Sequence, residues 1–125
     1  MHPAKLDSVL RMSGEDRVGY FVRRVAGFEC AWVLESGGAW AAVEDDLGRH
    51  ALPVWPEEAF ASACATDEWA GYRPLELSLA RLLLNLNDKP DFERVAVFPT
   101  PQRKGVFVEP AVLAEALQAE AAQYE

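Results

Sequence analysis

The side chains best suited to acid–base chemistry lie in one short segment, where His50 follows Asp45 and Asp46 across a turn. Histidine titrates near neutral pH, and a neighbouring carboxylate can orient it as a general base. The segment is therefore a candidate pocket for a small enzyme or a small-molecule-binding protein. A surface histidine with no catalytic task is the alternative, and the sequence favours it. The other histidine, His2, falls in an N-terminal segment that we expect to fray.

The spacing of ligand-type and nucleophilic residues gives little support to metal binding or covalent catalysis. Cys30, His50 and Cys64 are far apart and form no C-x-x-C, H-x-x-x-H or H-E-x-x-H motif. The acidic run 44–46 lacks the alternating ligands and central glycine of a calcium loop. The sequence also has no G-x-S-x-G elbow and no glycine-rich phosphate loop. We therefore predict no catalytic, metal or cofactor site and lean towards a non-enzymatic protein.

Aromatic and basic residues suggest recognition of a partner instead. Of the four tryptophans, Trp55 adjoins prolines and Trp69 lies in an expected loop, close to Tyr72. Rings held rigidly at a surface suit protein recognition. Arg103 and Lys104 form a basic loop tip that can contact an anionic partner, although such tips are often only polar turns. We predict that these five residues bind a partner, and leave open that the rings fill the core.

The chain is acidic, with a net charge of −8 that is unevenly distributed. Residues 1–27 carry a net charge of +2, and the remainder carries −10. An acidic body repels phosphate backbones, so no nucleic-acid partner is expected. The basic segment is free to contact the acidic body or a second copy, which leaves a homodimer open, or to form a solvated helix face. The acidity would also suit a basic target, so a toxin-neutralising protein is a third possibility.

The apolar residues are too dispersed for a membrane span. No run approaches the roughly 18 apolar residues that a spanning helix needs, and the first residues lack the apolar centre of a signal peptide. We therefore expect a cytoplasmic protein without a membrane partner. In that compartment Cys30 and Cys64 are predicted to be two buried thiols in preference to a disulfide.

A helix is predicted to begin at Ser13 and to end at Gly27. Ser13 can cap the free backbone N–H groups, and the acids after it suit the helix dipole. Arg17, Arg23 and Arg24 fall largely off the predicted buried stripe. That stripe consists of Val18, Phe21, Val22 and Val25.

Alternating apolar residues predict a three-strand antiparallel meander over 28–34, 39–43 and 49–52. Trp32 and Trp40 fall on neighbouring strands, where they are expected to share one face. The predicted inward residues of the first strand are Phe28, Cys30, Trp32 and Leu34.

The remaining pattern completes a single α+β domain over residues 1–125, a length that fits one core. We expect a mixed, mainly antiparallel sheet of five or six strands with helices packed on it. It combines N-terminal helices, the meander and a later β-hairpin. The further helices are predicted over 5–11, 57–65, 79–86 and 110–122, a strand over 72–77, and the hairpin over 95–98 and 106–108.

Four segments together resemble a known family. They are Arg17–Phe21, Pro53–Pro56 (Pro-Val-Trp-Pro), Glu68–Tyr72 (Glu-Trp-Ala-Gly-Tyr) and Val97–Pro101. In this order they resemble a family of small bacterial proteins known only as a domain of unknown function. The resemblance extends to the last helix, and it implies a stand-alone domain without implying an activity. The order of strands, helices and prolines is more distantly similar to the N-terminal domain of the enhanced-serine-sensitivity proteins, which by fold analogy implies protein–protein contacts.

The leading hypothesis is therefore a bacterial, cytoplasmic protein-binding or adaptor module whose contact surface lies in the region from Trp55 to Trp69. The alternatives are a small-molecule-binding protein or small enzyme with a pocket near Asp45, Asp46 and His50, and a toxin-neutralising protein.

Overall fold

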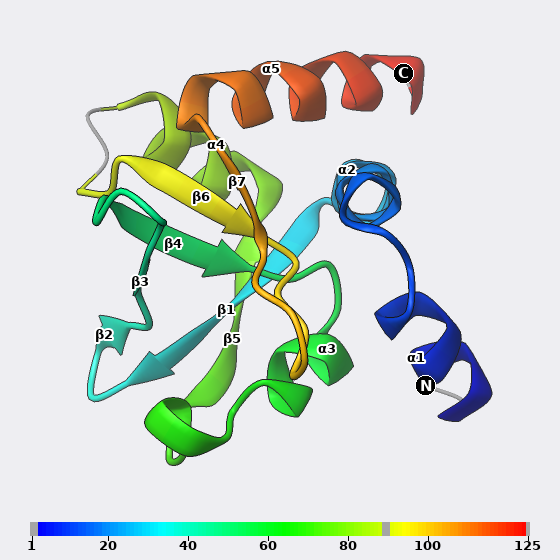
Figure 1. Ribbon diagram of the computed structural model, residues 1–125. Coiled ribbons are helices and arrows are strands. Elements are labelled where there is room, and N and C mark those ends of the chain that lie inside the picture. The colour runs from blue at the N-terminus through cyan, green and yellow to red at the C-terminus, as the bar shows by residue number, and fades with distance from the viewer. Residues whose placement is uncertain (1–2, 89–90, 125) are drawn as a thin grey trace.

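Two β-sheets share one core in the computed structural model, which describes residues 3–88 and 91–124 (Figure 1). One sheet has the strand order β2-β1-β5 and the other β3-β4-β6-β7. Every strand pair is antiparallel except the parallel pair β4–β6. The predicted α+β class with mainly antiparallel strands is confirmed. The elements are α1 (Pro3–Leu10), α2 (Gly14–Phe28), β1 (Cys30–Ser36), β2 (Ala39–Trp40), β3 (Val43–Glu44), β4 (His50–Val54), α3 (Glu58–Ala63), η1 (Asp67–Trp69), β5 (Arg73–Ser78), α4 (Leu79–Asn87), β6 (Arg94–Val97), β7 (Val106–Val108), α5 (Pro110–Ala121) and η2 (Ala122–Tyr124).

The strand arrangement differs from the predicted single sheet of five or six strands, because the expected meander is divided between the two sheets. β1 pairs with β2 and β3 pairs with β4, but β2 and β3 belong to different sheets. The two sheets are joined where the backbones of Trp32 and Trp55 exchange two hydrogen bonds of 2.9 Å. The sequence spacing of three short strands did not reveal that the chain changes sheet after Trp40.

β1 is the central strand of its sheet and is buried on both faces, so the predicted inward set for this strand is partly wrong. Ala31 and Val33 are fully buried together with Leu34. Phe28 ends α2 and its ring is 63% exposed. The register places Trp40 opposite Glu35, on the other face of the sheet from Trp32, so these two tryptophans do not share a face.

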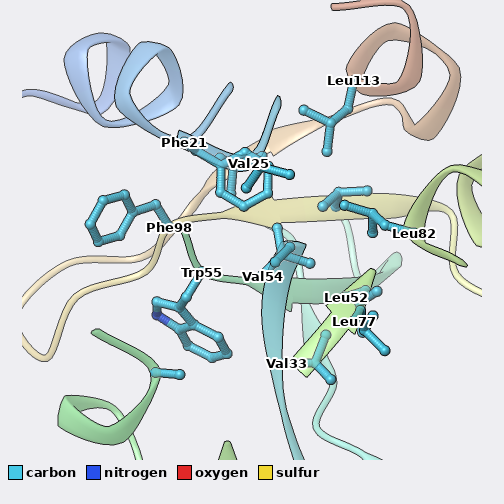
Figure 2. Close-up of a cluster of buried hydrophobic side chains, with 14 of the residues drawn as sticks. Phe21, Val25, Val33, Leu52, Val54, Trp55, Leu77, Leu82, Phe98 and Leu113 are labelled. Atoms are coloured by element: carbon cyan, nitrogen blue, oxygen red, sulfur yellow. The ribbon is translucent and has the colours of Figure 1, made fainter. Parts of the chain in front are cut away.

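The second sheet packs one face against the helices α2 and α5, and its opposite face is partly covered, since Ala51, Pro53 and Ala96 on that face are also buried. Leu52 and Val54 of β4 point into the core with Val95 and Val97 of β6, close to Phe21, Val25 and Leu113 of α2 and α5 (Figure 2). The run 95–98 is fully buried, as its continuous apolar sequence predicts. The strand register and the two-residue alternation give the residues of the opposite face, which are Val43, Ala51, Pro53, Arg94, Ala96 and Phe107.

The predicted helix starts are confirmed by their caps. Ser13 Oγ accepts a hydrogen bond from the Asp16 N–H, and Ser78 Oγ accepts one from the Arg81 N–H, both at 3.1 Å. The predicted stop at Gly27 is early, because α2 continues to Phe28 and Glu29 takes the left-handed position with φ of 58°. In the described part of the chain, no helix is long and apolar enough to cross a membrane.

Arg17 is the largest departure from the predicted helix surface, because it lies in the buried stripe of α2. Only 2% of it is exposed, and it precedes the core residues Phe21 and Val25 by four and eight positions. Its guanidinium donates to three backbone carbonyls, those of Phe98 (3.0 Å), Met12 (3.1 Å) and Lys104 (3.1 Å). Burial, and then repulsion by Arg103, lower its pKa from the ordinary arginine value. Arg17 thus ties the loop after β6 to the start of α2.

Replacing Arg17 by Ala is expected to lower the free energy of unfolding by about 3 kcal/mol, because three carbonyls lose a charged donor inside the protein. Urea unfolding followed by circular dichroism measures the change. Arg11→Ala is the matched control, since the Arg11 side chain is 82% exposed and forms a long ion pair of 3.9 Å with Asp7, and it should change stability by less than about 0.5 kcal/mol. Equal losses for the two variants would contradict the anchoring role of Arg17.

Candidate functional site

A cleft of about 460 Å³ lies between η1 and the loop 99–105, beside β3 and β7. In Figure 1 this loop is the yellow-to-orange turn that extends from β6 towards α3 and returns to β7. The cleft brings together Trp69, Arg103 and Lys104, three of the five residues predicted to bind a partner. Trp69 lies more than 30 residues before Arg103 in the sequence, and the tertiary fold brings the two into one cleft.

The 99–105 loop has a defined shape. Phe98 enters it with φ of 55°, a left-handed conformation that is costly for a residue with a large side chain. Thr100 and Arg103 pair through their backbones, and Thr100 Oγ1 also accepts from the Arg103 N–H at 3.1 Å. At Gly105 a Cβ would lie 2.9 Å from the carbonyl carbon of Ala96, so only glycine lets the returning chain approach β6 this closely.

The floor of the cleft is rigid because Trp55 and Cys64 both bind the loop from below. Trp55 Nε1 donates to the carbonyl oxygen of Pro99 at 2.9 Å, and Cys64 Sγ donates to the same oxygen at 3.4 Å. Trp55 is completely buried, so the prediction that its ring belongs to an exposed contact surface is wrong. The prolines beside it do not hold it at the surface, because its indole fills the core and satisfies its N–H there.

Trp69 occupies the position that Trp55 was predicted to hold. Its half-buried ring stands edge-on to Trp55, with 6.0 Å between ring centroids and an interplanar angle of 89°, and it lines the cleft. Tyr72 packs against the core and is not among the cleft residues. Of the three aromatic residues predicted to bind a partner, Trp69 is therefore the one that lines the cleft.

Charged side chains give the cleft two sides of opposite sign. Arg103 and Lys104 come from the loop, whereas Glu44 comes from β3, and Asp67 and Glu68 come from η1. An acidic wall of this kind was not predicted. In the sequence, Glu44, Asp67 and Glu68 are simply polar residues far from the basic loop. The fold places them on the other side of the cleft from that loop.

The predicted grouping of His50 with Asp45 and Asp46 does not form a site. Asp45 accepts hydrogen bonds from the Leu47 N–H and from Arg49, whose Nε lies 2.6 Å from Oδ2. Burial opposes ionisation of Asp45, but these hydrogen bonds outweigh it and lower its pKa. Asp46 pairs with Lys104 at 3.1 Å. Both carboxylates are therefore engaged elsewhere.

His50 itself is exposed and faces a separate hollow of about 470 Å³ that Arg81, Asn85 and Asp91 also line, whereas Asp45 and Asp46 do not line it. Among the hydrogen bonds and ion pairs of the described residues, none joins the His50 ring to a carboxylate. His2 lies outside the described residues.

Both cysteines are free thiols, as predicted, but Cys30 is half-buried, so the prediction of two buried thiols is correct in this respect for Cys64 and wrong for Cys30. Burial raises the pKa of Cys64 to about 11, and burial together with Glu76 raises that of Cys30. Both side chains are therefore protonated and weakly nucleophilic at neutral pH. Within residues 3–88 and 91–124, no group of three or more histidine, cysteine, aspartate or glutamate side chains is placed to hold a metal ion.

Two residues that shape the cleft escaped the sequence analysis. Arg17 carries a signal that was available, since it repeats at four-residue spacing with Phe21 and Val25. Gly105 carries none, because its requirement comes from a strand that lies next to it only in the folded chain.

A family model described as "Protein of unknown function (DUF2750)" matches residues 18–117. The match covers most of the chain, and the chain belongs to this family. No curated protein and no solved structure gives a significant match. The first helix and Arg17 precede the matched residues.

Replacing Trp55 by Ala is expected to destabilise the protein by about 3–5 kcal/mol, because it empties a core position and removes one of the two donors to the Pro99 carbonyl. Trp69→Ala removes a half-buried ring and should cost less than half as much. Urea unfolding of the two variants measures the difference. Equal costs would show that Trp69 belongs to the core as fully as Trp55 does.

The raised pKa of Cys64 makes stability dependent on alkaline pH. The folded state keeps the thiol protonated up to about pH 11, whereas the unfolded chain loses the proton near pH 9. Between these values the native state binds more protons, so the free energy of unfolding falls as pH rises. We expect urea unfolding at pH 8 and pH 10.5 to show a smaller fall in Cys64→Ala than in the unaltered chain. Identical pH dependence in both would contradict the burial of the thiol.

Proposed function

We propose that this member of the DUF2750 family is a non-enzymatic protein-binding module, and that the cleft between η1 and the 99–105 loop is its contact site. The observation that carries the proposal is the convergence of Trp69, Arg103 and Lys104 on one preformed hollow. Tryptophan and arginine are the residue types that contribute most to binding energy at protein interfaces.

The construction of the cleft supports a binding role. Trp55, Cys64 and Arg17 hold the loop from inside through its backbone carbonyls. A site fixed in advance loses little conformational entropy when a partner binds, which favours affinity. These supports act on the backbone of the loop, while the side chains of Trp69, Arg103 and Lys104 line the cleft.

The chemistry of the cleft favours binding over covalent catalysis. Its one sulfur nucleophile, Cys64, is buried and has a pKa of about 11. Its floor carbonyl, that of Pro99, is already occupied by two donors. The remaining lining combines apolar residues, charged residues and the uncharged polar residues Thr66, Thr100 and Gln102, a mixture that suits recognition of a chain segment.

Affinity capture from the native lysate, followed by mass spectrometry and by titration of the purified partner, tests the proposal. Trp69→Ala should weaken the partner's binding at least about ten-fold, as expected for a central aromatic contact. Trp40→Ala is the matched control, because it also removes a half-buried tryptophan but lies away from the cleft. Circular dichroism and urea unfolding verify that both variants are folded.

A partner that binds both variants equally would place the contact site elsewhere. A capture that recovers no stoichiometric partner at low and moderate salt would count against a protein-binding module.

A further inference from the structure

The loop on the basic side of the cleft is unusual in an acidic protein, because neither Arg103, which lines the cleft, nor Arg17, which supports the loop from inside, forms a salt bridge within the described residues. Lys104 pairs with Asp46, but both side chains are more than 70% exposed, and such pairs contribute little. Three cations therefore converge on one loop with weak compensation, while the whole chain carries a charge of −8.

The acceptors that these arginines do have are neutral backbone oxygens. Arg103 donates through one terminal nitrogen to the carbonyl of Leu10 at 2.7 Å, at the C-terminal end of α1. A guanidinium has five N–H donors, so Arg103 can keep this bond and still bind a carboxylate. A carboxylate also accepts more strongly than a carbonyl, and its two oxygens match the guanidinium geometry.

The other charges of the cleft set the orientation of a bound segment. Glu44, Asp67 and Glu68 line the walls that β3 and η1 provide, whereas Arg103 and Lys104 line the loop. Trp69 offers an apolar surface on the same cleft. A polyanion such as a nucleic acid would meet the acidic walls and the negative body, so a single acidic residue beside apolar ones fits better.

We infer that the cleft binds an extended segment of a partner protein that places an aspartate or glutamate on Arg103 and Lys104 and an apolar side chain against Trp69. This inference rests on the proposed function and specifies the chemistry of the partner. The acidic walls would then repel a segment that places its acidic residue next to them and not next to Arg103 and Lys104. The position of the charge in the segment therefore determines specificity.

Peptide pools with capped ends provide the test. Each eight-residue pool has a fixed Leu and, two positions away, Asp, Asn or Lys, with mixed uncharged residues elsewhere and a fluorescein label. Fluorescence anisotropy with the full chain should show the Asp pool binding at least about ten-fold tighter than the Asn pool, which corresponds to one charge-assisted contact. The difference should shrink as salt is raised.

Variants assign the effect to the cleft. Arg103→Gln should remove most of the preference for Asp, and Glu68→Gln should strengthen binding of the Asp pool because it removes a repelling charge. Arg11→Gln is the matched control, since it removes an exposed arginine outside the cleft and should leave binding unchanged. A preference for Asp that survives Arg103→Gln would overturn the inference.

The outcomes separate the inference from the proposed function. Equal binding of the Asp and Asn pools, both lost in Trp69→Ala, would retain the cleft as the contact site and overturn its acidic preference. Tightest binding of the Lys pool would indicate a basic target and would also overturn it. Absence of binding by every pool, together with a lysate partner that depends on Trp69, would overturn the acidic-segment inference alone, and loss of that partner too would remove the proposed function.

Discussion

Arg17 donates hydrogen bonds to the carbonyl oxygens of Met12, Phe98 and Lys104 from a position that solvent barely reaches. These acceptors lie before α2 and at both ends of the loop that follows β6, so one side chain joins segments more than 80 residues apart. The bonds to Phe98 and Lys104 help to hold the loop, which begins with the left-handed conformation of Phe98. The shape of the cleft depends on this anchor, although Arg17 is not among the residues that line it.

The same anchor shapes the electrostatics of the loop. Burying a charge is costly, and here neutral carbonyls satisfy the guanidinium without cancelling its charge. The charge of Arg17 therefore adds to that of Arg103, and repulsion between them adds to the effect of burial, which is the main cause of the lowered pKa of Arg17. The loop thus carries positively charged side chains in a chain whose net charge is −8. The Trp55 and Cys64 contacts to Pro99 complete the support from the core side. The loop is thus positioned by groups that remain hidden from any partner.

Elements with a strong local signal were predictable, and elements that depend on pairing were less so. The cap at Ser13 and the helix predicted over 79–86 agree with the structure, because each depends on residues within a few positions. The predicted meander is wrong, because alternating apolar residues indicate a strand but do not show which other strand pairs with it. In the candidate site, Trp69, Arg103 and Lys104 were found from their residue types. Trp55 was misplaced because a tryptophan between prolines has the same sequence signature at a surface and in a core.

The sequence by itself determined the α+β class, the caps and apolar stripes of the main helices, the buried strand 95–98 and the basic tip at residues 103–104, since these follow from composition and short-range periodicity. Only the tertiary structure decided that the strands form two sheets, that Trp55 lies beneath Trp69, and that an acidic wall faces the basic loop. It also decided that Arg17 is buried and that position 105 must be glycine. These features depend on which residues, distant in sequence, contact one another in the folded chain. The sequence pattern shows how apolar each residue is, but it does not show which residues will contact it.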